Sequence, residues 1–120
     1  MFFPEGRVRV FVHGRPVDMR KSFTGLIALT KQALGRNPLS GHLFVFINRR
    51  GDYLKALYWD RSGFCLWCKR LERGRFIRGW TGQLDRELDV TALKLLLEGI
   101  EPARQHLRYQ CSTTPLEELG

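Results

Sequence analysis

Between Arg49 and Arg78 the chain reads RRGDYLKALYWDRSGFCLWCKRLERGRFIR, a stretch in which basic side chains are interleaved with aromatic ones. It holds nine arginines and lysines against three acidic residues. Guanidinium groups bind phosphate oxygens through paired hydrogen bonds, and flat aromatic rings stack on nucleobases. An acid–base or metal-dependent enzyme would instead need converging carboxylates, histidines or thiols. The composition of this stretch therefore favours contact with a nucleic acid.

The net charge of +8 is unevenly distributed along the 120 residues. Residues 1–78 hold sixteen basic and five acidic side chains, whereas residues 79–120 hold four basic and seven acidic ones. A positive field of this kind steers a protein toward polyanions, of which nucleic acid is the commonest. An anionic membrane surface, an acidic protein, or a solvated surface that only maintains solubility are the alternatives.

Two groups of cations are candidate phosphate sites. Arg20 and Lys21 fall in the expected first turn of a helix that Asp18 caps, where the helix dipole disfavours cations, so we interpret them as completing an anion site. The alternative is that Asp18 and solvent absorb this penalty. A second and denser group of cations consists of Lys69, Arg70, Arg73 and Arg75. The alternative interpretation of this group is a charged strand edge that discourages aggregation.

The pattern predicts a single small α+β domain over residues 1–102, followed by a polar, flexible tail over 103–120. A strand over 7–12 precedes one long amphipathic helix from Asp18 to about Leu34, whose apolar stripe includes Phe23 and Leu26. Strands over 42–50, 53–60, 64–71 and 75–80 are joined by short turns, which predicts an antiparallel β-meander of about four to five strands. A short C-terminal helix over 92–98 stops at Gly99.

Both faces of the predicted central hairpin carry large side chains. If Gly51-Asp52 forms the turn, one face holds Val45, Ile47, Leu54, Ala56 and Tyr58, and the other holds Phe44, Phe46, Leu57 and Trp59, edged by Arg50 and Lys55. The second face is either covered by the final helix or a dimer partner, or it is an aromatic platform edged with cations for a single strand. Arg49, Arg50 and Lys55 are therefore further candidate contacts to nucleic acid.

Few residues favour metal or catalytic chemistry. Cys65-x-x-Cys68 is half of a zinc site without a second pair, so we interpret both thiols as core residues and expect no metal or cofactor. A nuclease that holds metal ions is a remote alternative, because most of its candidate carboxylates occupy capping or turn positions; these carboxylates are Asp18, Asp52, Asp60 and Glu72. The odd number of cysteines, with no secretory signal and no apolar run of about 20 residues, predicts a cytoplasmic protein without membrane contact.

Several blocks of the chain together carry a specific family pattern. They are PVDMRKSF with Gly25-Leu26 (16–26), SGHLFVF (40–46), NRRGD (48–52), LYWD (57–60), KRLERGRF (69–76) and LLEGI (96–100). Over about Val10 to Ile100 the chain resembles the TnpB-type accessory protein of the insertion sequence 66 family of bacterial transposable elements. The resemblance implies a role in transposition beside a separate, larger transposase that carries the catalytic carboxylates.

We therefore expect a non-catalytic accessory protein that binds DNA, mainly through the phosphate backbone, or that helps to assemble the transposase complex. An adaptor that binds the transposase without touching DNA is the alternative. The expected partners are DNA and the transposase, and the sequence leaves open whether the protein also forms a homodimer.

Overall fold

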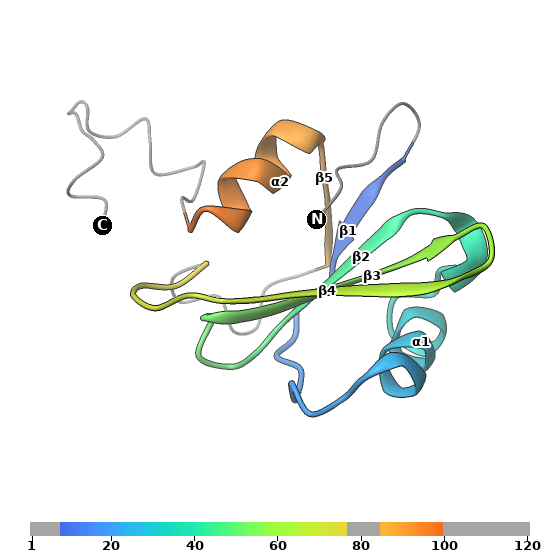
Figure 1. The fold of residues 1–120 in the computed structure, drawn as a ribbon, viewed down its shortest axis with the longest axis horizontal. Coiled ribbons are helices and arrows are strands. Elements are labelled where there is room, and N and C mark those ends of the chain that lie inside the picture. The colour runs from blue at the N-terminus through green and yellow to red at the C-terminus, as the bar shows by residue number, and fades with distance from the viewer. Residues whose placement is uncertain (1–7, 77–84, 100–120) are drawn as a thin grey trace.

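The computed structural model describes residues 8–76 and 85–99 (Figure 1). A five-stranded sheet lies between two helices, α1 (Phe23–Gln32) on one face and α2 (Val90–Leu97) on the other. The strands are β1 (Val10–Val12), β2 (Leu43–Ile47), β3 (Tyr53–Asp60), β4 (Gly63–Arg70) and β5 (Arg86–Leu88), and a short 3-10 turn, η1, spans Pro38–Ser40. The predicted α+β class is confirmed. The predicted flexible tail at 103–120, and with it the domain boundary near 102, lies outside the described residues.

The sheet is mixed, in the order β4-β3-β2-β1-β5. β2, β3 and β4 form the predicted antiparallel meander, but β1 pairs parallel to β2, with Val10 opposite Leu43 and Val12 opposite Val45. The prediction of an all-antiparallel sheet is wrong for β1, because the chain crosses back through α1 and re-enters the sheet in the same direction. Side-chain alternation identifies a strand without identifying its neighbour.

The strand bounds follow the prediction closely in the meander. β3 has the predicted bounds, whereas β2 ends at Ile47 because Asn48 begins a turn. Of the strand predicted over 75–80, Arg75 and Phe76 are not in a strand, and 77–80 lie outside the described residues. β5 was not predicted, because its three residues, Arg-Glu-Leu, carry too little of an apolar pattern.

Helix α1 is shorter than predicted. It begins at Phe23 after the N-cap residue Ser22 and has ten residues, so the expectation of one long helix from Asp18 is wrong. Asp18 instead forms a local turn, since its carboxylate accepts from the backbone N–H of Arg20 (2.9 Å) and its carbonyl accepts from that of Lys21 (3.0 Å). Gly35, with φ +65°, follows the end of the helix in the left-handed conformation that glycine adopts readily.

The two sheet faces form two apolar layers. Val45, Ile47 and Leu54 pack with α2, whereas Phe44, Phe46 and Leu57 pack with α1. The predicted assignment of side chains to faces is confirmed by the register, in which Phe44 lies opposite Leu57 and Val45 opposite Ala56. The aromatic platform is wrong, because Phe44, Phe46 and Leu57 have no exposed surface. The covering element is α1 and not the final helix.

Helix α2 closes the other layer. Its N-cap is Asp89, whose carboxylate accepts from the N–H of Ala92 at 2.7 Å, so the helix begins two residues before the predicted start at 92. Leu93, Leu96 and Leu97 are buried against the sheet, and Gly99 (φ +81°) follows the helix as predicted. Neither helix in the described part of the chain is long and apolar enough to cross a membrane.

Candidate nucleic-acid interface

The turn between β2 and β3 presents two arginines at its tip. The N–H of Gly51 donates to the carbonyl of Asn48 at 3.0 Å, which places Arg49 and Arg50 at the two central positions of a four-residue turn. The Asn48 side-chain oxygen accepts from the N–H groups of Gly51 (2.9 Å), Asp52 (3.1 Å) and Tyr53 (3.1 Å). One half-buried amide therefore holds the backbone beneath two exposed guanidinium side chains.

The segment after β4 folds back onto this turn. Leu71 N–H donates to the Asp52 carbonyl at 2.8 Å, and Phe76 N–H donates to the Gly51 carbonyl at 2.6 Å. The Phe76 ring is fully buried in the layer beneath α2, so it anchors the segment to the core. Arg75 Nε donates to the Arg50 carbonyl at 2.7 Å. Two basic segments separated by some twenty residues of sequence are thus fastened together at one end of the sheet.

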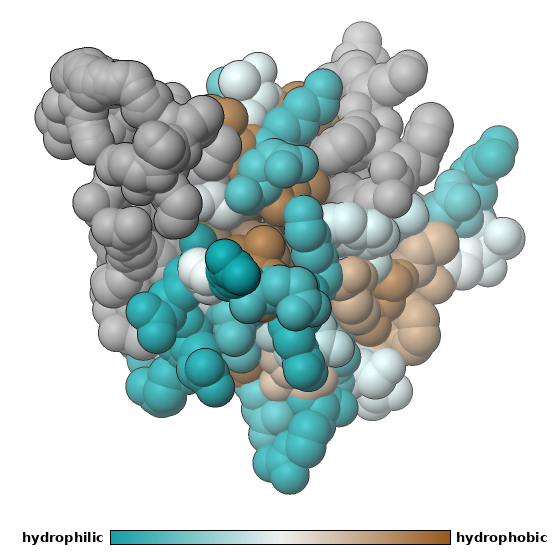
Figure 2. Space-filling view, turned by 60° about the vertical axis from the view of Figure 1, so that its left-hand side comes forward, coloured by the Kyte–Doolittle hydropathy of each residue, from teal (hydrophilic) through white to brown (hydrophobic). Residues whose placement is uncertain are grey.

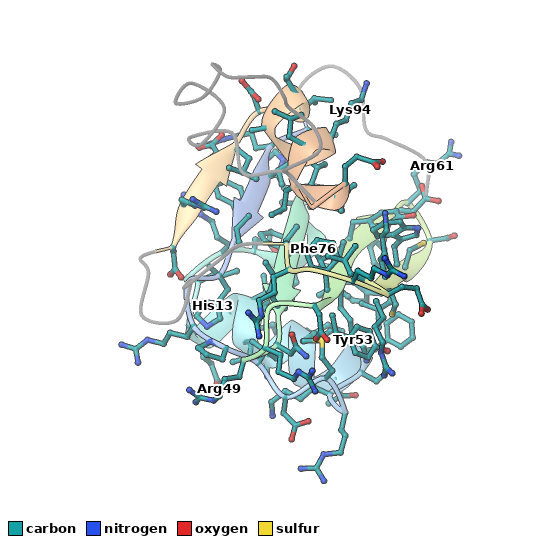
Figure 3. All side chains as sticks on the ribbon, turned by 90° about the vertical axis from the view of Figure 1, so that its left-hand side faces the viewer. His13, Arg49, Tyr53, Arg61, Phe76 and Lys94 are labelled. Atoms are coloured by element: carbon teal, nitrogen blue, oxygen red, sulfur yellow. The ribbon has the colours of Figure 1, made fainter. Side chains whose placement is uncertain are left out.

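We call the exposed guanidinium side chains gathered here the arginine cluster; they are Arg49, Arg50, Arg70, Arg73 and Arg75. Figure 3 looks onto this end of the molecule, with Phe76 inside and Arg49 projecting into solvent. Figure 2 shows a largely hydrophilic surface on the same side. The only carboxylate paired with a member of the cluster within the described residues is Asp52, at 3.8 Å from Arg50 Nε. The cluster therefore keeps most of its positive charge.

Arg70 joins the cluster to an aromatic ring. Tyr53 lies opposite Arg70 across the β3–β4 ladder, and the Arg70 guanidinium carbon is 4.8 Å from the centre of the Tyr53 ring. A guanidinium stacked on a ring keeps its N–H groups available at the rim of its plane. Tyr53 thus orients the Arg70 side chain and leaves its donors able to reach a phosphate.

Two of the predicted contact residues are structural. Lys55 is buried, and its Nζ donates to the Lys21 carbonyl at 2.8 Å, so it cannot reach a polyanion. Lys69 Nζ donates to the Leu97 carbonyl at 2.8 Å, at the C-terminal end of α2, where a cation is favoured by the helix dipole. Their inclusion among the DNA contacts is not supported, because the fold uses each ammonium group to satisfy a carbonyl.

The Arg20–Lys21 site also differs from the prediction. Both residues precede α1, and the Arg20 guanidinium pairs with the Asp18 carboxylate, with Nη2 2.7 Å and Nε 3.1 Å from its oxygens. The hydrogen bond from Arg20 lowers the pKa of Asp18 to about 2, so the carboxylate stays charged and neutralises Arg20. Lys21 remains exposed, and the Lys55 contact to its carbonyl brings it to the same end of the sheet as the arginine cluster.

The candidate metal residues are dispersed. Cys65 lies opposite Tyr58 and Cys68 opposite Lys55, on different faces of β4, and Cys68 is exposed rather than in the core as predicted. Asp52 precedes β3 and Asp60 ends it, about 25 Å apart for a strand of this length. No group of three or more histidine, cysteine or acidic side chains that could hold a metal ion occurs within residues 8–76 and 85–99.

Local sequence patterns give only a weak signal for the residues that build the site. Asn48 and Tyr53 are two such residues, and Asn and Gly at the first and fourth positions of NRRG are a signal for a four-residue turn. His13 is also buried, with Nδ1 2.9 Å from Asp85 Oδ1. Its partner is distant in sequence, and no local pattern marked the contact.

Comparison with known proteins identifies the family. The family model described as IS66 Orf2 like protein matches residues 8–107. The chain belongs to this family. The resemblance stated from the sequence blocks is thereby confirmed, and the matched range contains the whole arginine cluster of this IS66 Orf2-like chain.

Two relatives come from Sinorhizobium fredii (strain NBRC 101917 / NGR234). "Uncharacterized protein y4hO" is 40% identical over 101 residues, which cover 82% of this chain and 86% of the relative. "Uncharacterized protein y4jC" is 44% identical over 77 residues, which cover 64% of this chain and 66% of the relative. No solved structure matches the chain.

Proposed function

We propose that this IS66 Orf2-like chain is a non-catalytic accessory protein of insertion-sequence transposition that binds DNA through the arginine cluster. Membership of the family supports a role in transposition, and the exposed guanidinium groups support binding to phosphate. The observation that carries the proposal is the fastening of the 71–76 segment to the Asn48–Asp52 turn, which holds five arginines on one end of the sheet. A polar surface needed only for solubility would have no reason to fix its charges in this way.

The cluster is suited to the phosphate backbone rather than to base sequence. Its arginines extend from a turn, from the end of β4 and from a loop, and no helix in the described ranges carries them into a groove. The two described helices are instead packed against the sheet through their apolar sides. Sequence-independent affinity that depends strongly on salt is the expected behaviour, in the bacterial cytoplasm where the element's DNA lies.

The test compares two charge-matched triple variants. Arg49→Gln, Arg50→Gln and Arg73→Gln remove exposed members of the cluster whose guanidinium groups make no hydrogen bond within the described residues. Arg15→Gln, Arg61→Gln and Arg86→Gln remove three exposed arginines that are not in the cluster. Each variant lowers the net charge from +8 to +5, so a difference in binding reports position and not total charge.

Fluorescence anisotropy with labelled duplex and single-stranded DNA over a range of salt concentrations gives the readout. Five phosphate contacts predict a slope of log K against log[salt] of roughly −4 to −5, and the cluster variant should have a slope shallower by about 3. The control variant should keep the original slope. Equal losses in both variants would reduce the effect to net charge and contradict a site at the cluster.

The same variants distinguish the adaptor alternative. If the cluster binds an acidic surface of the transposase and not DNA, the cluster variant should bind DNA like the control yet fail to retain the transposase in a pull-down. That pair of results would replace the DNA proposal with the adaptor. Thermal melts of both variants should stay within a few degrees of the wild type, because exposed charges contribute little to stability.

A further inference from the structure

Strand β4 forms an edge of the sheet that no described strand covers. It pairs with β3 along all eight residues, from Gly63 opposite Asp60 to Arg70 opposite Tyr53, and the strand order ends there. Its residues 63–67 are half-buried, and Figure 2 shows a hydrophobic strip over this outer part of the sheet, beside the hydrophilic surface. Phe64 and Leu66 are at the margin of the α1 layer, and Trp67 is at the margin of the α2 layer.

The backbone groups on this edge can be assigned from the ladder. Leu71 N–H bonds to the Asp52 carbonyl in the same register as β3–β4, and in antiparallel pairs such bonded positions recur at every second residue. Gly63, Cys65, Trp67 and Lys69 are therefore the positions that bond to β3. The N–H and C=O groups of Phe64, Leu66, Cys68 and Arg70 point away from the sheet, as a row of donors and acceptors.

Over residues 63–68 this edge carries no charge, bulge or proline of the kind that protects exposed strands. Natural edges are shortened, charged, bulged or interrupted by proline. The opposite edge, β5, has only three residues, and two of them are Arg86 and Glu87. β4 has eight residues in continuous register without a bulge, and its segment GFCLWC contains no charge and no proline. Such an edge is a template for pairing with another strand.

We propose that β4 is the interface of a two-fold dimer, in which it pairs antiparallel with β4 of a second copy and joins two sheets into one. The outward-facing positions limit the possible registers of this pairing. The register centred on Leu66 leaves the fewest like-charge and polar–apolar pairs between the two strands. It places Leu66 opposite Leu66 of the second copy, Phe64 opposite Cys68 and Cys65 opposite Trp67. Each apolar side chain then meets an apolar side chain on the same face of the joined sheet.

The charges of β4 favour a second copy as the occupant. In this register Lys69 meets Gly63 and Arg70 meets Ser62 of the other copy, so no basic side chain faces its own equivalent. The one carboxylate of the β3–β4 hairpin, Asp60, lies at the strand end that receives Lys69 and Arg70 of the second copy. The antiparallel arrangement also keeps the two arginine clusters at opposite ends of the joined strands.

The dimer goes beyond the proposed function and stands independently of it, since it requires no DNA. Its first test is the oligomeric state of the wild-type chain, measured by analytical ultracentrifugation at about 100 µM, where a dimer with a Kd of about 1 µM is almost fully formed. A dimer is the expected result. A monomer at that concentration overturns the proposal.

Two sets of variants then locate the interface. Leu66→Lys and Leu66→Glu place like charges across the two-fold axis, so each should be a folded monomer, whereas an equimolar mixture should form a heterodimer. Cys68→Pro removes an outward-facing N–H without breaking the β3–β4 ladder, as proline is tolerated at such positions. It should be a monomer, and the matched Cys68→Ala variant should remain a dimer. Circular dichroism melts show whether each variant is folded.

The outcomes are decisive in each case. If the Leu66 variants do not associate on mixing, the register centred on Leu66 is wrong, and if Cys68→Pro remains a dimer, the interface is not this edge. If the wild type is a monomer but Cys68→Pro loses capture of the transposase while Cys68→Ala keeps it, the edge accepts a strand of that protein and not a second copy.

Discussion

Replacing Asn48 by alanine should destabilise the protein by about 2–3 kcal/mol, because its side-chain oxygen accepts three backbone N–H groups and its Nδ2 donates to Asp52 Oδ1 at 2.9 Å. A net contribution of about 0.5–1.5 kcal/mol for each of these four bonds gives a sum of about 2–6 kcal/mol. The half-buried position lowers it, since water can reach part of the turn. The backbone of Arg49 and Arg50 would lose its support at the same time.

Urea denaturation followed by circular dichroism measures the loss. With a slope of about 1.5–2 kcal/mol per molar urea, the midpoint should fall by about 1–2 M without a change in slope. DNA affinity should also fall at temperatures where the variant is folded, because the two turn arginines would no longer be held in place before binding.

Asn48→Asp is the matched control. It keeps an oxygen that accepts the three N–H groups, but it loses the Nδ2 donor and puts a second carboxylate beside Asp52. Its stability relative to the wild type should therefore recover as the pH falls through the carboxyl range, whereas that of Asn48→Ala should not. A loss below about 0.5 kcal/mol in Asn48→Ala would show that water replaces the amide fully, and would refute the role assigned to this turn.

Two other predictions follow from the corrected position of α1. Leu26→Ala should cost about 2–5 kcal/mol in urea denaturation, because Leu26 is fully buried, whereas Phe23→Ala should cost less than about 1 kcal/mol, because 41% of Phe23 is exposed; equal losses would place Phe23 in the core after all. The hydrogen bond from Arg20 holds the pKa of Asp18 at about 2, below the usual 3.8, so the stabilising contribution is present above about pH 4 and is lost as the pH falls from there toward 2. Carboxyl NMR titration should show this midpoint in the wild type and a higher one in Arg20→Gln, in which the backbone N–H of residue 20 still donates to the carboxylate; an unchanged midpoint would contradict the pairing.

Local patterns predicted the elements better than their partners. The alternation of side chains in residues 43–60 gave the correct faces for Val45 and Phe44, because the side-chain period of a strand is independent of what lies beside it. It carried no information on the parallel pairing of β1 with β2, which depends on the path of α1. The predicted start of α1 is too early because the Asp18 carboxylate can either cap a helix or accept hydrogen bonds from Arg20 in a turn. In this fold it accepts from Arg20.

The candidate site was predicted in part for a related reason. The density of arginine in 49–50 and 70–75 reflects a surface that the fold brings together through the Leu71 and Phe76 backbone bonds. The sequence does not distinguish Lys55 and Lys69 from their exposed neighbours, because a buried ammonium group depends on a carbonyl that is distant along the chain. For Lys55 that carbonyl belongs to Lys21, and for Lys69 to Leu97. Charge density alone therefore overestimated the number of contacts.

The position of α2 at the end of the described chain has a consequence for how the protein folds during synthesis. β1 to β4 leave the ribosome before α2, but one face of their sheet exposes Val10, Leu43, Val45 and Leu54 until Leu93, Leu96 and Leu97 arrive to cover it. β1 also gains its second neighbour only when β5 has been made. Stable folding is therefore a late event that requires nearly the whole matched region, and a nascent chain shorter than about Leu97 presents an apolar face to its surroundings.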